Sequence, residues 1–168
     1  ALVLVLLWLF RSLPREVPAI PAGILSPVDG SVTAIISTAR DPYLERDALL
    51  IRLHQRHTGE FSMYSPSEAK LMERWLPQET PDNTRLRGDS EHVALWLRTD
   101  YQEDLIVALD VSTRWHYVKC DKFAGERLGQ GQRCGLMGFG RPVEVYLPLH
   151  ARPRVKVGQP VCAGVDLL

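Results

Sequence analysis

The amino-acid sequence predicts an all-β or β-rich domain of short strands, folded as a barrel or a sandwich. The first observation is an alternating run at 143–147, where valine or leucine at the odd positions is separated by Glu144 and Tyr146. That two-residue period is typical of a half-buried strand. The second is that glycine, proline and aspartate recur at short intervals between apolar runs, as in sandwiches and barrels.

Composition fits one globular domain and argues against a nucleic-acid partner. The chain has 168 residues, enough for one sizeable core. Its 20 basic and 20 acidic residues cancel, whereas nucleic-acid-binding domains usually carry a basic surplus. The three cysteines form no CxxC pair, and an odd number does not make a disulfide framework. We expect three reduced thiols, which suits a domain facing the cytosol.

The N-terminal segment is the most apolar part of the chain. Residues 1–10, ALVLVLLWLF, carry no charge, but a bilayer crossing needs ~20 residues. Trp8 and the following Arg11 and Arg15 are typical of the cytoplasmic end of a membrane helix. We therefore expect the end of a transmembrane or membrane-anchoring helix. A buried core helix is the alternative, and a cleaved signal peptide is disfavoured because no small-residue cleavage site follows.

Prolines at positions 14, 18 and 21 predict that residues 11–23 form an extended linker. Residues 23–35 then form a strand, a turn and a second strand. Proline sets φ, Asp29 bonds nearby backbone and Gly30 takes positive φ in this turn, residues 26–30, SPVDG. The pattern recurs 39 positions later as residues 65–69, SPSEA. Residues 24–168 are thus expected to form the β domain.

Further strands are expected along the domain. Residues 49–53 form one, and residues 93–98 and 105–109 form a pair, with the polar run 78–91 as a surface loop between. A last strand–turn–strand unit covers 155–168. Its Gly158 and Gly164, six apart, resemble the hammerhead turns of lipoyl- and biotinyl-type domains, a barrel-sandwich hybrid. The Met-Lys tip of those carriers is missing, so a prosthetic-group carrier is disfavoured.

Two histidines share a short segment before the second SPxx turn. His54 and His57 could face one metal ion, but a protein site needs further ligands and no third candidate is visible. We expect no metal site and regard the two as an exposed loop pair.

Residues 131–140 hold four glycines and predict a tight turn that feeds the strand 143–147, which Pro148 ends. This stretch resembles the self-processing segment of the phosphatidylserine decarboxylase family in its short, single-domain form. In that family a Phe-Gly-Ser or Leu-Gly-Ser sequence breaks between Gly and Ser, and the Ser becomes an N-terminal pyruvoyl group. Here the sequence is Phe139-Gly140-Arg141, so Gly140 and Arg141 hold the processing position and the Ser is absent.

Two further segments carry the resemblance. The SPVDG turn is a signature of the family, so Asp29 matches an aspartate of its self-processing machinery. Residues 9–15, LFRSLPR, are similar to its Phe-Phe-Arg-Asp-Pro-x-Arg segment. Alignment on Pro66 puts Phe61 where the family has its processing His. A second alignment, on the His54-x-x-His57 spacing, leaves the proline turn out of register by several residues, so we prefer the first.

The resemblance implies a pyruvoyl lyase, but the chemistry lacks its nucleophile. Pyruvoyl formation needs a hydroxyl that attacks the preceding carbonyl. Arg141 has none, no Ser or Thr follows Thr113, and Cys134 lies seven positions early. We therefore expect no pyruvoyl cofactor and no other cofactor. Arg141 is either an exposed arginine at the turn end or a basic group that binds substrate phosphate or carboxylate in bidentate fashion.

The resulting functional expectation is a membrane-associated pseudoenzyme of this family. It would bind phospholipid, or a partner protein or second copy of itself, at the cytoplasmic face of a membrane. Two alternatives stay open. One is an active decarboxylase that forms phosphatidylethanolamine, and the other is a structural barrel-sandwich module without a ligand.

Overall fold

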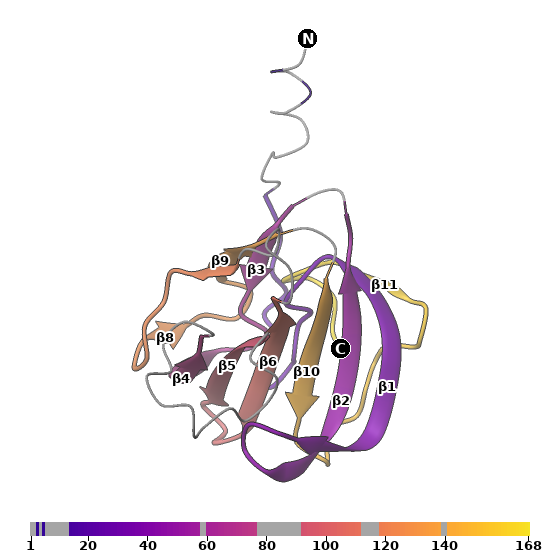
Figure 1. Cartoon of the computed structure of the whole chain (residues 1–168), viewed down its shortest axis with the longest axis vertical. Helices are drawn as coiled ribbons and strands as arrows, with labels where there is room; N and C mark the ends of the chain where they lie inside the picture. The colour runs from indigo at the N-terminus through magenta and orange to yellow at the C-terminus, as the bar shows by residue number, and fades with distance from the viewer. Residues whose placement is uncertain are drawn as a thin grey trace.

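The computed structural model describes residues 3, 5, 14–57, 60–76, 92–111, 118–138 and 141–168. Every element named in this part of the chain is a β-strand (Figure 1). The strands are β1 (Gly30–Asp41), β2 (Arg46–Gln55), β3 (Ser62–Tyr64), β4 (Ala69–Trp75), β5 (His92–Thr99), β6 (Asp104–Asp110), β7 (Val118–Cys120), β8 (Arg127–Leu128), β9 (Arg133–Met137), β10 (Pro142–Leu147) and β11 (Pro160–Val161).

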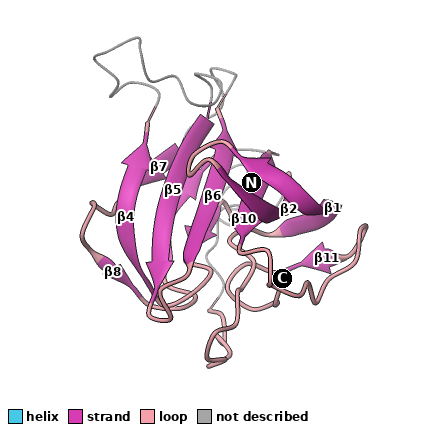
Figure 2. Cartoon of the chain, turned by 90° about the horizontal axis from the view of Figure 1, so that it is seen from below, coloured by secondary structure: helices cyan, strands magenta, loops and turns pink. Residues whose placement is uncertain are grey.

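The strands form two antiparallel sheets. Eight lie in the order β11-β1-β2-β10-β6-β5-β4-β8, and three lie in the order β3-β9-β7. The larger sheet curls, with β4, β5 and β6 on one side and β10, β2 and β1 on the other (Figure 2). The prediction of a β-rich fold is confirmed. The closed form of the predicted barrel is not found, because the two outer strands of the larger sheet, β11 and β8, do not pair with each other among the described residues.

The strand order is the same from either end if β11 corresponds to β8, β1 to β4, β2 to β5 and β10 to β6. The two turns that the sequence predicts as a repeat are equivalent in this arrangement. In one, the Ser26 hydroxyl donates to the Val28 carbonyl at 2.7 Å, and in the other the Ser65 hydroxyl donates to the Ser67 carbonyl at 2.8 Å. The molecule therefore has an internal pseudo-twofold relation.

The two turns also bond to each other. The Leu25 N–H donates to the Pro66 carbonyl at 2.7 Å, and the Tyr64 N–H donates to the Pro27 carbonyl at 2.9 Å. These reciprocal bonds lie around the pseudo-twofold axis and join the halves through backbone that would otherwise be left unpaired. The 39-residue recurrence is thus a structural repeat.

The glycine pair six residues apart also occurs twice. Gly158 and Gly164 have φ of 86° and 68°, and Gly125 and Gly131 have φ of 95° and 67°. Such left-handed backbone favours glycine. The hammerhead-like unit predicted at 155–168 therefore has a counterpart at 122–135 that the sequence analysis missed. Only a short part of the predicted last unit, β11, is a named strand.

The inner face of the large sheet holds the main core, and the strand predicted at 143–147 contributes Val143, Val145 and Leu147 to it. A second, smaller cluster lies on the opposite face. It buries Tyr146, which is 5% exposed, against Tyr43 at a ring distance of 6.3 Å. The prediction of a half-buried strand is therefore wrong at Tyr146, because the turn after β1 covers the outer face there.

The glycine-rich stretch is only partly the predicted turn. Residues 133–137 are strand β9, in the three-stranded sheet. A Cβ on Gly135 would lie 2.4 Å from the Lys119 carbonyl oxygen, so glycine permits close strand pairing here. Phe139 and Gly140 lie outside the described residues.

Two other predictions fall largely or wholly outside the described residues. The loop 78–91 is one of them, and of residues 1–10 only Val3 and Val5 are described, both helical and exposed. No helix formed by described residues has the length and hydrophobicity that a membrane crossing requires. The described part of the linker, 14–23, contains no strand, and the three cysteines are unpaired.

Candidate functional site

Asp29 and Arg141, far apart in sequence, flank the same end of β2. The Gln55 N–H donates to the Arg141 carbonyl at 2.7 Å, and the N–H of the next residue, Arg56, donates to the Asp29 carbonyl at 2.9 Å. Asp29 directly precedes β1 and Arg141 directly precedes β10, the two strands that pair with β2. The fold therefore brings two of the sequence-predicted residues to one end of the sheet.

The Asp29 carboxylate is fully engaged by a residue of the linker. Arg15 donates from Nη1 to Oδ1 at 2.7 Å and from Nη2 to Oδ2 at 2.6 Å, and the Ala163 N–H donates to Oδ1 at 2.8 Å. The Arg15 and Asp29 side chains are only 12% and 15% exposed. A bidentate pair of this kind fixes geometry as well as charge. Asp29 thus acts as the anchor of the chain segment that precedes the domain.

Glu60 and Tyr64 complete this cluster. Arg15 Nη2 donates to Glu60 Oε2 at 2.9 Å, and the Tyr64 hydroxyl donates to Glu60 Oε1 at 2.5 Å. The Arg15 guanidinium also lies over the Tyr64 ring, 5.2 Å from its centroid. The bond to Asp29 raises the pKa of Arg15, against the effect of burial, and burial together with the Glu60 bond raises the pKa of Tyr64 to about 12. The cluster therefore places the Arg15 guanidinium between the carboxyl groups of Asp29 and Glu60.

The sequence analysis gave Arg15, Glu60 and Tyr64 no place in a site. Arg15 was noted only as a basic residue after the apolar segment and as part of a segment similar to the family's. The Arg15–Glu60 contact joins residues 45 positions apart, and no local pattern predicts such a pair. Asp29 was the one member found, because the SPVDG turn that contains it resembles a signature of the family.

Arg141 is fully buried, so its interpretation as an exposed arginine at the turn end is wrong. The two-residue period of β10 places it on the inward face with Val143. Its three guanidinium nitrogens have no hydrogen-bond partner among the described residues. Burial lowers the pKa of Arg141 to about 10, although the charge of Asp110 acts in the opposite direction. The group therefore stays protonated at neutral pH.

Phe61 lies beside the segment that leads to Arg141. Its carbonyl accepts the Met137 N–H at 2.8 Å, at the end of β9. The Phe61 side chain cannot accept or donate a proton. The fourth predicted residue, Gly140, lies outside the described part of the chain.

The residues present do not fit a pyruvoyl group. The group would have to form from the side chain at 141, which is a buried guanidinium with no hydroxyl. Cys134 is no substitute nucleophile, because it is 3% exposed and burial raises the pKa of its thiol to about 12. A protonated, buried thiol is inert.

The two histidines singled out in the sequence lie next to each other. The rings of His54 and His57 lie edge to face with centroids 5.7 Å apart. Within the described ranges, no group of three or more His, Cys, Asp or Glu side chains could hold a metal ion.

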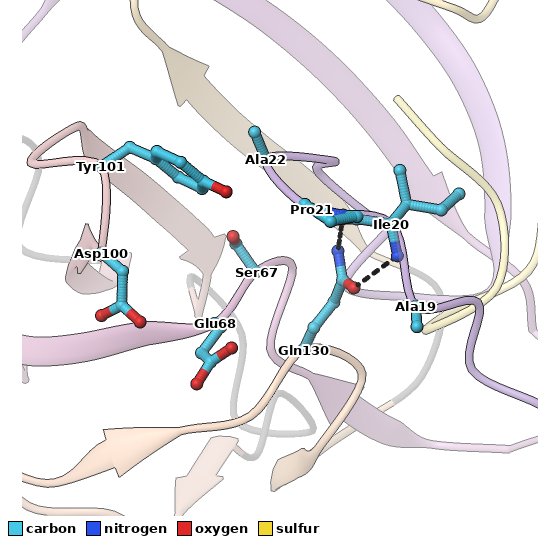
Figure 3. Close-up of a pocket in the computed structure, with 9 residues that line it drawn as sticks. All are labelled: Ala19, Ile20, Pro21, Ala22, Ser67, Glu68, Asp100, Tyr101 and Gln130. Carbon is cyan, nitrogen blue, oxygen red and sulfur yellow. Dashed lines mark hydrogen bonds between the residues drawn. The ribbon is translucent and has the colours of Figure 1, made fainter.

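The counterpart of the Asp29 cluster in the other half is a pocket of about 230 Å³ (Figure 3). Glu68, which takes the Asp29 position in the second turn, lines it with its side chain 65% exposed. The Gln130 amide donates to the carbonyls of Ile20 at 3.0 Å and Gly23 at 2.8 Å. The linker therefore contacts both halves, through a part-buried ion pair at Asp29 in one and through amide bonds from Gln130, beside an open pocket, in the other.

Curated relatives match nearly the whole chain. No family model and no solved structure matches it. A phosphatidylserine decarboxylase proenzyme of Nitrosomonas europaea is 34% identical over 99% of this chain and 78% of its own length. Proteins of the same name from Aromatoleum aromaticum and Ralstonia pickettii are 35% and 36% identical over 95% and 99% of this chain and 75% and 79% of their own lengths. The chain belongs to the phosphatidylserine decarboxylase proenzyme family.

Proposed function

We propose that this chain is a membrane-associated phosphatidylserine decarboxylase homologue that does not process itself, a pseudoenzyme that acts by binding phospholipid or a protein partner. The observation that carries the proposal is Arg141, a buried arginine at the position that matches the family's pyruvoyl-forming serine. The proposed substrate class follows from the name of the relatives, which act on phosphatidylserine.

The chemistry supports the loss of processing. Chain cleavage of this type begins when a side-chain hydroxyl attacks the carbonyl before it, giving an ester that then eliminates. A guanidinium has no oxygen with which to form that ester. Asp29 is held by Arg15 in a bidentate pair, and Phe61 offers no base. Self-processing needs a hydroxyl, an aspartate and a base. Here the hydroxyl and the base are missing, and the aspartate is already bound by Arg15.

An active decarboxylase is the second candidate, favoured by identity of 34% to a protein named as a proenzyme. Intact-mass spectrometry of the purified chain separates the two. We expect one uncleaved species at the full mass of 19.0 kDa. Two fragments produced by cleavage between residues 140 and 141 would refute the proposal and support the active decarboxylase.

Membrane binding has its own test. The uncleaved chain should sediment with vesicles that contain phosphatidylserine and less with vesicles of phosphatidylcholine alone. Arg141→Ala should reduce this preference, whereas Arg133→Ala, at an exposed position of β9, should leave it unchanged. Equal sedimentation with both vesicles, unaffected by Arg141→Ala, would leave the third candidate, a structural module without a ligand.

A further inference from the structure

Five polar atoms are buried without a partner at the end of the sheet where β2 meets β10. They are Nε, Nη1 and Nη2 of Arg141 and Nε2 and Oε1 of Gln55. Arg141 is 0% exposed and Gln55 is 1% exposed. Buried polar side chains are nearly always hydrogen-bonded, so five neighbouring polar atoms without a partner need an explanation.

The strand register places the two side chains next to each other. Pro142 is opposite His54 and Val143 is opposite Leu53, so the next pair along is Arg141 and Gln55. The Gln55 N–H donates to the Arg141 carbonyl, which confirms that step. Both residues continue the inward-facing rows of their strands, so their side chains enter the end of the main core from neighbouring strands.

An unpaired guanidinium in this place is costly. Taking a charge out of water carries a large penalty, which only a counter-ion and hydrogen bonds can offset. The pKa of Arg141 is lowered but stays near 10, so loss of the proton does not remove the charge at neutral pH. Asp110, at the end of β6, attracts the guanidinium, but no described side chain accepts a hydrogen bond from it. The donors therefore point to an acceptor from outside the described chain.

We propose that Arg141 and Gln55 form an internal oxyanion site at the β2–β10 end of the core. The guanidinium fork would bind two oxygens of a phosphate or carboxylate group side by side, and the Gln55 amide would donate a further bond. The inference deepens the proposed function, on which it rests, because Arg141 keeps its place directly before β10 only if the chain is not cut before it. Free phosphate and a lipid headgroup offer the same oxyanion chemistry.

Thermal unfolding of the full chain in inorganic phosphate tests the site, with chloride at the same ionic strength as reference. Anything that binds only the folded state raises Tm. We expect phosphate to raise Tm well above chloride, and Arg141→Met to weaken the apparent phosphate affinity about tenfold or more. Gln55→Leu should weaken it less. Arg152→Met, at an exposed arginine between β10 and β11, should behave as the unchanged chain.

A second measurement keeps the test independent of folding defects in the variants. In the unchanged chain, the side-chain Nε–H resonance of Arg141, assigned by its loss in Arg141→Met, should shift on addition of phosphate or of vesicles containing phosphatidylserine. A response to phosphate identifies a free-anion site, and a response to the vesicles alone identifies a headgroup site. Either result supports the proposal.

The proposal is overturned if neither probe moves the Arg141 resonance and phosphate has no effect on Tm beyond that of chloride. The intact mass of the same sample separates this failure from that of the proposed function. A full-length mass without an anion response removes only the oxyanion site. Cleavage before residue 141 removes the non-processing function itself, whatever the anion response.

Discussion

Asp29 and Glu68 occupy the same position of two equivalent turns but have different surroundings. The Asp29 carboxylate receives three hydrogen bonds, two of them from the part-buried Arg15. The Glu68 side chain is 65% exposed and lies 3.8 Å from Arg127, itself 61% exposed. An exposed pair of this kind contributes little, whereas loss of Asp29 would leave the largely desolvated Arg15 guanidinium with Glu60 as its remaining carboxylate partner. Loss of the carboxylate should therefore lower the free energy of unfolding more at the first turn than at the second.

We predict that Asp29→Asn destabilises the chain by about 3 kcal/mol, because Arg15 keeps its charge and loses its bidentate partner. The matched change Glu68→Gln should alter the free energy of unfolding by less than about 0.5 kcal/mol. Urea titration of both variants measures the difference. Equal effects would mean that the Arg15–Asp29 pair does not anchor the linker.

Restoring a serine at position 141 should not restore chain cleavage. Arg141→Ser restores the missing hydroxyl, but we predict no chain cleavage while Phe61 remains, because no base stands at the position that matches the family histidine. Intact mass after prolonged incubation gives the answer, and Arg141→Ser with Phe61→His is the comparison. Cleavage of the single variant would show that Phe61 does not hold the histidine position.

How far the sequence predicts this site depends on the kind of contact. The turns themselves are visible as local patterns, and the resemblance of two of them to family motifs allowed Asp29 and the processing position to be named in advance. The burial of Arg141 could not, because arginine at a turn end is usually exposed. Only the alternation of β10, extended by one residue beyond Pro142, hints at its inward direction. The partners Arg15 and Glu60 come from outside any periodic segment and needed the structure.

At the scale of elements, the alternation of apolar and polar residues correctly predicted that Val143 and Val145 of β10 face the core. The glycine content around β9 wrongly indicated a turn. Glycine at 135 suggested a turn, yet it lies in a strand whose backbone approaches that of β7 too closely for a side chain. Glycine serves both purposes, and the sequence alone does not distinguish them.

Gly30, the first residue of β1, has the same requirement beside the candidate site. A Cβ there would lie 2.1 Å from the His54 carbonyl oxygen, a backbone atom that cannot move away without opening the β1–β2 pair. We predict that Gly30→Ala destabilises the chain by about 1–3 kcal/mol, the usual range for overpacking. It should also expose to hydrogen exchange the Arg56 amide, which donates to the Asp29 carbonyl just before β1.

Gly129→Ala is the matched control for this change. A Cβ at Gly129 would meet only the Gln132 side chain, at 3.7 Å. That substitution should be neutral or stabilising by up to about 1 kcal/mol, since alanine restricts the unfolded chain. Thermal unfolding of the two variants and amide exchange at Arg56 provide the measurement. A Gly30→Ala chain as stable as the Gly129→Ala chain would contradict the packing argument.

At the scale of the whole molecule, the pseudo-twofold relation does not divide the chain into two domains. β10 and β6 pair across the axis, with Val145 opposite Val107. One core cluster contains residues of both halves, including Leu53 of β2 and Leu97 of β5. The sequence revealed the 39-residue recurrence of the turns, but the glycine pairs repeat at 33 residues. Because the turns and the glycine pairs repeat at different distances, a search for one fixed period does not find the full repeat.

Because the core is shared, we predict that both halves unfold in one transition. Leu53→Ala and Leu97→Ala, at 0% and 1% exposure, should each cost about 2–5 kcal/mol. Either change should lower the amide protection of β1 and β4 equally, although each lies in only one half. Ile36→Ala, at a position of β1 that is 40% exposed, serves as the control with a small effect. In each variant, the free energy of unfolding from far-UV circular dichroism should equal the opening free energy from hydrogen exchange in both β1 and β4. A chain in which Leu97→Ala frees β4 while β1 stays protected would instead fold as two units, and the two linker contacts, at Asp29 and at Gln130, would then belong to separately stable halves.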